Sequence, residues 1–309
     1  MKNLLPVLSL VLILLCAFTF NTPDVKLQYT FKKGDSYEFA QVSNQTIKQT
    51  IPGAGEMTTE VVTSGSLTLK VVEVTATGAK IEAQYTKLKI DTKGPMTMAM
   101  DSESSSDEMP NKVIRSMMNK PFFFTMTNQG IVEKTENAEN IYSGLNSLGL
   151  DEKTLAATRQ TFQQTINESN LKALLETGLI NYPQSKIKTG DTWKSFSGVA
   201  INFPMKTENT WNLKNIEGNV ASIDSDGVLA NADSTKVMSL PNGLKARTDL
   251  SGRQASKSKV DIKTGWPTET KVLSEIKGKI VLLAGSVIPS DMDVPMEIVS
   301  ESSFTIVKK

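Results

Sequence analysis

A phrase of seven residues that occurs twice is the strongest constraint on the fold of this chain. Residues 31–37 read Phe-Lys-Lys-Gly-Asp-Ser-Tyr, and residues 187–193 read Ile-Lys-Thr-Gly-Asp-Thr-Trp. A glycine at positive φ followed by an aspartate that bonds nearby amides is typical of a tight bend. The hydroxyl residue and the aromatic then begin a strand, with the aromatic facing the core. The repeat predicts two copies of one β-rich unit.

The residues after each phrase alternate between apolar and polar side chains. This alternation is typical of half-buried antiparallel strands. It predicts strands at 37–51, 57–63, 66–75 and 79–90, and again at 192–203, 206–216 and 220–224. Hairpins at 122–134 and 260–273 complete the two halves. Each half is therefore expected to be a meander of about five or six strands.

Helical patterns lie between the two halves. Residues 107–118 and 137–148 are two candidates, and residues 151–177 form the longest, with Asp151 as a cap and Gly178 as a stop. Residues 92–107 are predicted to be a flexible loop. The fold class is therefore α+β, mostly antiparallel β: two duplicated curved meander sheets with a helical insert. The halves either join in one large sheet or pack as two lobes.

The N-terminus is typical of a signal peptide for export to the periplasm or cell surface. Lys2 precedes an almost wholly apolar run, Leu4 to Leu15, which is too short for a comfortable membrane-spanning helix. A membrane anchor is the weaker alternative. Leu14-Leu15-Cys16-Ala17 is similar to a lipidation motif, but Leu15 is large where a small residue is needed, so lipid attachment at Cys16 is disfavoured. The predicted division is a leader at 1–20, a first β-rich half at 21–135, a helical connector at 136–183 and a second β-rich half at 184–309.

Composition argues against enzyme chemistry. The chain has no histidine, and its one cysteine is Cys16 in the leader. A mature chain of this kind cannot build a Ser-His-Asp site or a histidine-based zinc site. The acidic groups at 101–108 and 224–226 lack a complete calcium ligand set and are predicted to be solvated loop charge. We therefore expect no catalytic residue, metal or cofactor.

The chain also lacks the features of a nucleic-acid-binding or membrane-spanning protein. Its net charge is +1, and it has neither a phosphate-binding glycine loop nor a basic run with interleaved aromatics. After the leader, no apolar run is long enough to span a membrane. The expected partner is a hydrophobic small molecule or another envelope protein.

Methionine clusters in the middle of the sequence. Thirteen methionines occur in the chain, and flexible thioether side chains suit adaptable apolar pockets. This pattern suggests a soft binding site for a lipid-like ligand between the sheet and the helices. The candidate ligand-binding residues are Met96, Met98, Met109, Met117, Met118, Phe162 and Ile166. The alternative interpretation is that these side chains simply fill the core.

Several short motifs together resemble one known family. They are residues 29–35, residues 70–74 with Gly78, Lys120-Pro121-Phe122, Gly190-Asp191-Thr192-Trp193 and Thr264-Gly265-Trp266. The chain is similar to exported proteins of Bacteroidetes-type bacteria that are catalogued as a domain of unknown function. The resemblance implies an exported, β-rich protein and no particular activity. The layout is also similar to lipid-carrier domains of the bacterial envelope, at the level of fold only.

Three functions fit these observations. The first is a non-enzymatic envelope protein that holds a hydrophobic ligand or lipid between sheet and helices. The second is a structural or interaction module of the cell surface. The third, a carboxylate-dependent hydrolase, would need two acids about 5–10 Å apart in a cleft. The space between the sheet and residues 151–177 discriminates between the first two.

Overall fold

The computed structural model describes residues 24–309, except 96, 202, 232, 241–243 and 286–287. The predictions for the leader at 1–20, for Cys16 and for Met96 therefore lie outside the described residues.

All the described strands belong to one antiparallel sheet. Its order is β6-β5-β3-β2-β1-β13-β12-β11-β9-β8-β7, with β4 beside β3 and β10 beside β11. The strands of the first half are β1 (Ser36–Ile51), β2 (Gly55–Val74), β3 (Gly78–Lys93), β4 (Met98–Asp101), β5 (Phe122–Thr127) and β6 (Val132–Glu136). Those of the second half are β7 (Thr192–Ile201), β8 (Phe203–Glu217), β9 (Val220–Asn231), β10 (Met238–Ser239), β11 (Lys245–Asp261), β12 (Pro267–Leu282) and β13 (Met292–Lys308).

The expectation of a mostly antiparallel β fold is confirmed, but the two meanders do not form separate sheets. The last strand, β13, joins them because it pairs with β1 on one side and with β12 on the other. This strand was not among the predicted ones. Of the two arrangements left open by the sequence, the structure has the single large curved sheet.

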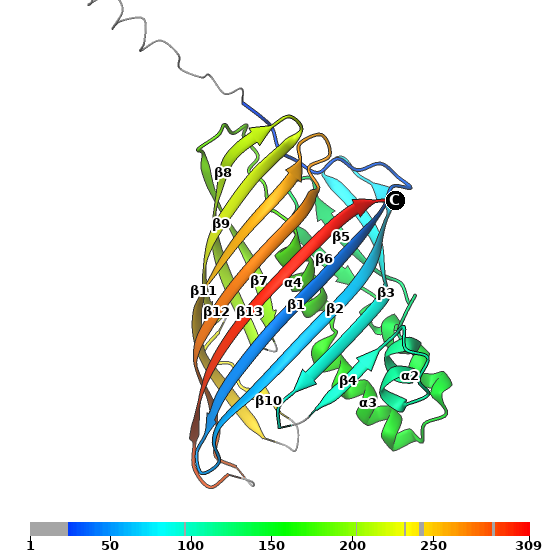
Figure 1. The fold of residues 1–309 in the computed structure, drawn as a ribbon, viewed down its shortest axis with the longest axis vertical. Coiled ribbons are helices and arrows are strands. Elements are labelled where there is room, and N and C mark those ends of the chain that lie inside the picture. The colour runs from blue at the N-terminus through cyan, green and yellow to red at the C-terminus, as the bar shows by residue number, and fades with distance from the viewer. Residues whose placement is uncertain (1–23, 96, 202, 232, 241–243, 286–287) are drawn as a thin grey trace, which may run out of the picture.

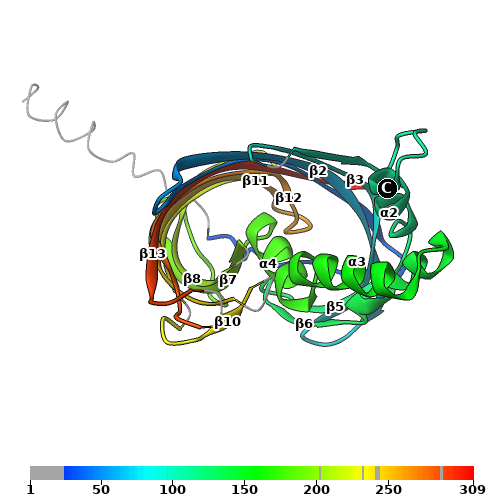
Figure 2. The same cartoon turned by 90° about the horizontal axis from the view of Figure 1, so that it is seen from below.

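The sheet curls around the helical connector (Figure 1). The helical elements are α2 (Met109–Ser116), the 3₁₀ helix η1 (Ala138–Leu148), α3 (Glu152–Thr165) and α4 (Glu168–Gly178). Figure 2 shows α4 inside the curve of the sheet, with α3 running from it past β5 and β6. Because α4 contacts both terminal strands, β6 and β7, it fills the open side of the sheet.

The prediction of one continuous helix over 151–177 is wrong. Asp151 does cap the first part, since its Oδ1 accepts the Thr154 backbone N–H at 3.0 Å. The backbone then leaves the helical region at Ile166 (φ −112°, ψ 92°), and the Asn167 side chain caps a second helix. The apolar stripe read from the sequence therefore belongs to two helices with different directions.

Two strand predictions also need correction. Residues 57–63 and 66–75 form the single strand β2, and the predicted loop at 92–107 contains the short strand β4. The acidic group at 224–226 lies in strand β9 and not in a loop.

The two Gly-Asp bends have the same hydrogen bonds. Gly34 and Gly190 have φ of +92° and +93°. Gly34 N–H donates to Val71 at 2.8 Å, and Gly190 N–H donates to Leu213 at 2.7 Å. The return bonds end on the carbonyls of Asp35 and Asp191. Both bends launch the first strand of a meander, which fits the predicted duplication; a common origin of the halves stays a prediction.

The buried apolar side chains form two clusters. The larger one joins strands to every helical element, and we call it the helix-backed core; examples are Leu69, Ile114 and Leu175. The smaller one contains only strand residues among its buried members, and we call it the strand-only core. Its buried members are Met205, Leu229, Ala246, Leu250, Ile276, Ile280, Val294, Met296 and Ile298.

Candidate functional site

A band of uncharged polar side chains separates the two cores on the inner face of the sheet. In one row across the strands, Gln45 is opposite Ser300, Ser300 is opposite Ser274, and Ser274 is opposite Gln254. Because side chains alternate between the two faces of a strand, these four point to the same side. With the next row they form what we call the polar belt: Ser43, Gln45, Asn209, Ser225, Gln254, Ser256, Ser274, Ser300 and Ser302.

Hydrogen bonds within the belt run from strand to strand. The Ser302 hydroxyl donates to Ser43 Oγ at 2.9 Å. The Ser274 hydroxyl donates to Gln254 Oε1 at 3.3 Å. These bonds satisfy part of the polar capacity of the belt and hold the side chains across the sheet.

Besides Asn215 Oδ1, whose side chain is half-buried, two polar atoms on β8 have no hydrogen-bond partner among the described residues. They are Asn209 Oδ1 and Thr207 Oγ1, and both side chains are buried. Gly227 makes room for the amide, because a Cβ at that position would overlap Asn209 Oδ1. A buried polar group left unpaired costs about 1–3 kcal/mol, so this part of the belt is ready to accept a bonding partner.

A cavity of about 340 Å³ lies between the polar belt and α4. Its polar lining comes from Gln41, Ser43, Gln45, Thr63, Asn170, Thr177, Gln254, Ser274, Ser300 and Ser302, and its apolar lining from Ile47, Val61, Ile90, Ala173, Leu174, Val272 and Phe304. All of these lining side chains are uncharged. The cavity therefore combines hydrogen-bonding groups on the strands with apolar surface on both strands and helix.

A second cavity of about 180 Å³ continues toward the helix-backed core. It shares Gln41, Thr63, Ile90, Asn170 and Leu174 with the larger one and adds Phe39, Leu67, Tyr85, Leu88, Leu171 and Ile166, among others. Leu174 of α4 thus faces both spaces. The helix is held close to the sheet at its end, where a Cβ on Gly178 would lie 2.6 Å from the Phe39 ring.

The methionine-based candidates gather only in part. Met117 is buried in the helix-backed core, where Met118, Phe162 and Ile166 also pack. Met98 and Met109 are exposed at 44% and 45%. Of the named candidates, Ile166 lines one of the two cavities. A ligand role for these residues stays a prediction.

The polar belt was not found from the sequence, although the sequence holds a signal for it. Serines at 300 and 302 occupy every second position of a strand whose other inward residues, such as Ile298 and Phe304, are apolar. The same interruption occurs at Gln254, Ser256 and Ser258 in β11. Small polar residues at the core-facing positions of several strands indicate a lined space in place of a filled core.

Aromatic side chains close the end of the sheet where β1 begins. Trp266 stacks on Tyr37, with ring centroids 4.3 Å apart, and meets Tyr29 edge to face at 5.1 Å. Tyr29 Oη accepts the Ile180 N–H at 3.0 Å, and the Tyr182 hydroxyl donates to the Gly265 carbonyl at 2.8 Å. This closed end is packed by side chains that anchor the segment before β1.

Burial raises the pKa values of the tyrosine hydroxyls at the closed end of the sheet. Desolvation raises the pKa of Tyr29 and of Tyr182 well above the ordinary value near 10. Desolvation and, next, the nearby Asp35 carboxylate raise the pKa of Tyr37 to about 12. These phenols therefore stay neutral at any physiological pH and serve as hydrogen-bonding packing groups.

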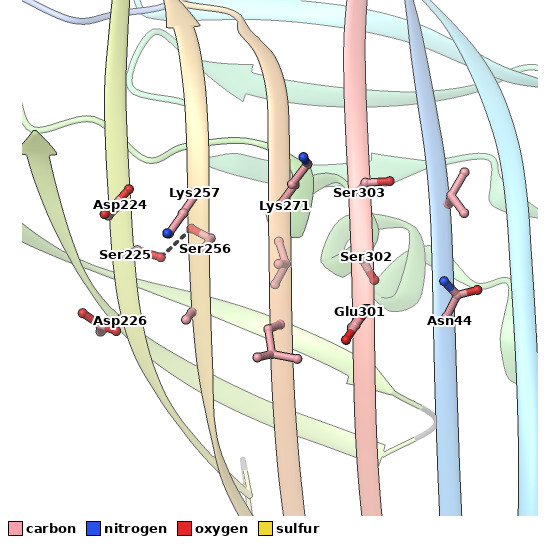
Figure 3. Close-up of a pocket in the computed structure, with 14 residues that line it drawn as sticks. Asn44, Asp224, Ser225, Asp226, Ser256, Lys257, Lys271, Glu301, Ser302 and Ser303 are labelled. Atoms are coloured by element: carbon pink, nitrogen blue, oxygen red, sulfur yellow. Dashed lines mark hydrogen bonds between the residues drawn. The ribbon is translucent and has the colours of Figure 1, made fainter. Parts of the chain in front are cut away.

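The outer face of the sheet carries a groove of about 480 Å³ (Figure 3). Residues of five adjacent strands line it: exposed ones such as Asp226, Lys257, Lys271 and Glu301, and between them the buried Ser225, Ser256 and Val272. Lys257 is opposite both Lys271 and Asp224 in the register, so like and opposite charges alternate across the groove. This surface is solvent-exposed and charged, whereas the lining of the inner cavity is uncharged.

Neither a metal-binding cluster nor a membrane-spanning helix is present in the part of the chain that the structure describes. In residues 24–309 outside the gaps named above, no group of three or more His, Cys, Asp or Glu side chains could hold a metal ion. No helix within that part of the chain is long and apolar enough to cross a membrane.

Comparisons with known proteins add a family match. The model described as "Family of unknown function (DUF6263)" matches residues 76–267, which is more than half of the chain. No curated protein matches the sequence.

Among solved structures, a lipovitellin structure concerned with lipid–protein interactions is 9% identical, with a TM-score of 0.49. The alignment covers 90% of this chain but only 26% of lipovitellin. An outer membrane channel from Pseudomonas putida F1 is 7% identical, with 90% and 97% of the two chains covered and a TM-score of 0.28. DynF from the dynemicin biosynthesis pathway of Micromonospora chersina is 7% identical, with 91% and 85% covered and a TM-score of 0.21.

Proposed function

The chain belongs to DUF6263, a family of unknown function, and we propose that it is a non-enzymatic, exported envelope protein that binds a hydrophobic small molecule or lipid between the curved sheet and α4. The observation that carries the proposal is the 340 Å³ cavity under α4, together with its 180 Å³ neighbour. Small-molecule sites are commonly concave, largely apolar spaces of about 300–1,000 Å³.

The position of the cavity also supports binding. Ala173, Leu174 and Thr177 of α4 face Val272, Ser300 and Ser302 of the sheet across it. The α4 helix is a small element of eleven residues on the open side of the curved sheet; residues 166–167 connect it to α3, and the longer segment 179–191 connects it to β7. Movement of such an element would admit a ligand without unfolding the long strands.

The lack of histidine in the sequence and the uncharged lining of the cavity support a binding role over an enzymatic one. A chain without histidine lacks the usual general base near neutral pH. The cavity lining supplies hydroxyls and amides but no carboxylate or amine to activate them. Export is proposed from the apolar leader at 4–15.

Native mass spectrometry of the protein purified from its own host tests this function. We expect a non-covalent adduct that solvent extraction removes and that reappears when the extracted lipids are added back. A mature mass lacking the leader, found in the envelope fraction, is expected from export. Ligand-free protein from its own host, with no binding of the extract, would contradict the proposal.

An interaction module is the second candidate, and the outer face favours it. Phe196 and Val228 are exposed at 72% and 64%, and Val228 lines a second outer groove together with the charged Lys194, Glu208 and Arg253. A Phe196→Asp variant would lose an envelope partner in crosslinking of intact cells if that face is the functional one. Unchanged crosslinks in that variant would reject this candidate.

A further inference from the structure

We propose that the ligand is an uncharged amphiphile, with a head group bearing hydroxyls or amides at the polar belt and an alkyl chain along the strand-only core. This inference rests on the proposed binding function and adds the chemical class of the ligand. It follows from three features of the inner face: the charge of the cavity lining, the hydrogen-bonding groups of the polar belt, and the apolar row that lies next to the belt.

The charge of the lining excludes an ionic head group. All seventeen side chains around the larger cavity are uncharged among the described residues. A carboxylate, phosphate or ammonium moved there would lose its hydration without gaining a counter-ion, which costs several kcal/mol. On the outer face, by contrast, lysines and acids are within reach of the groove. An ionic ligand would therefore prefer the outside of this protein to its interior.

The hydrogen-bonding groups of the belt favour a head group that both donates and accepts. Hydroxyls at Ser43, Ser300 and Ser302 can do either, and amides at Gln45 and Gln254 offer both functions separately. On the same inner face, Asn209 Oδ1 is a buried acceptor with no described partner. It sits over Gly227, which is opposite Gln254 in the register. A bound hydroxyl or amide N–H near Gln254 would complete this set of bonds.

The apolar row next to the belt suits an alkyl chain. Ile47, Ile298 and Ile276 are opposite one another in the register. Each lies two residues along its strand from a belt residue, Gln45, Ser300 or Ser274, so the two rows are about 7 Å apart. Ile47 lines the cavity and also packs on the strand-only core. A chain that leaves the belt in this direction would meet mainly apolar side chains of the strand-only core, with the buried Thr207 and Thr248 as polar exceptions.

The test compares three probes that share a sixteen-carbon acyl or alkyl chain but differ in the charge of the head group. They are 1-monopalmitoylglycerol, palmitate and hexadecyltrimethylammonium, titrated below their aggregation concentrations against the full mature chain with bound N-phenyl-1-naphthylamine. We expect the neutral glyceride to displace the dye at least about tenfold more tightly than either ion, a difference of about 1.4 kcal/mol.

A pair of charge variants sharpens the test. Ser300→Lys places an ammonium in the belt and is expected to shift the preference from the glyceride to palmitate. Thr305→Lys, on the outer face of the same strand, is the matched control and should leave the order of the probes unchanged. Circular dichroism and the urea midpoint report whether each variant is folded, and Ser300→Gln, which keeps the site neutral, should retain the glyceride preference.

The outcomes separate the two claims. If the dye binds but palmitate displaces it as well as the glyceride does, or if Ser300→Lys leaves the order unchanged, the uncharged class is wrong and the binding function stands. If neither the dye nor any probe binds the wild-type protein, the binding function itself fails.

Discussion

The five strands that bury side chains in the strand-only core, β8, β9, β11, β12 and β13, also contribute to the helix-backed core, but the two cores are closed in different ways. The helix-backed core is filled by helical elements and by the aromatic closed end, and Leu69, Ile81 and Leu175 in it are fully buried. The strand-only core is made by the curl of the sheet, and the polar belt and the cavity separate it from α4.

From this difference we propose that one part of the sheet provides stability and another part provides the binding site. Where helices cover the inner face, large aromatic and aliphatic side chains alternate with outward polar ones along each strand. Where the helix stands off, the inward positions change to serine and glutamine. We infer that the first region supplies most of the folding free energy and that the second tolerates a space because the first is well packed.

The largest expected effect is at the closed end, in Gly265. It has φ of +73°, and a Cβ there would overlap the Gln28 carbonyl oxygen. Gly265→Ala combines backbone strain with displacement of the segment before β1, so we expect a loss of more than about 4 kcal/mol, measured by urea unfolding. Gly34→Ala is the control: φ is +92° but no atom lies within 4 Å, so strain alone should cost about 1–2 kcal/mol. Equal losses would contradict the closed-end account.

Truncations in the two cores come next. Leu69→Ala in the helix-backed core removes a side chain with no exposure, and we expect a loss of about 3–5 kcal/mol. Ile276→Ala in the strand-only core should cost less, about 2–3 kcal/mol, because the neighbouring cavity lets the site adjust. Differential scanning calorimetry compares the two. A larger loss at Ile276 would reverse the assignment of stability.

Alkaline pH is expected to weaken one core only. All five tyrosines of the chain lie in the helix-backed core. Burial raises the pKa of Tyr37 to about 12 in the folded protein, against about 10 when unfolded. The folded state thus favours the protonated phenol, and this contribution is fully present below pH 10 and lost as pH rises toward 12. Hydrogen exchange at pH 9 and pH 11 should show earlier opening near Tyr37 than near Ile298; uniform opening would contradict this.

A substitution in the polar belt is expected to have the smallest effect on the free energy of unfolding, but it should weaken ligand binding. Ser300→Val exchanges a partly buried hydroxyl for a slightly larger apolar side chain beside the cavity, and the bond that it removes, to Ser43, is long, at 3.5 Å. We expect a change within about 1 kcal/mol in urea unfolding, with weaker binding of a neutral amphiphile in fluorescence titration. Val299→Ser, the neighbouring outward position, is the control for composition. A large loss of stability with unchanged binding would make the belt a structural element.

The sequence predicted the strands better than their arrangement. Alternation at Leu67 and Leu69, or at Ile81 and Ala83, follows directly from a half-buried strand. The helix break at Ile166 was not visible, because apolar residues continue in helical spacing on both sides of it. The strand β13 was missed since Ser300 and Ser302 interrupt its apolar pattern, and that interruption is part of the proposed binding site. The single sheet depends on pairing between β1 and β13, which are far apart in sequence.

The most direct test of the central claim is dye binding in two cavity-filling variants. Leu174 faces both inner cavities from α4, whereas Leu273 lines the outer groove. The account predicts that Leu174→Trp weakens binding of N-phenyl-1-naphthylamine at least about tenfold, while Leu273→Trp binds the dye like the wild-type protein, with both variants folded by circular dichroism. Loss of binding in Leu273→Trp together with normal binding in Leu174→Trp would contradict the account and move the site to the outer face.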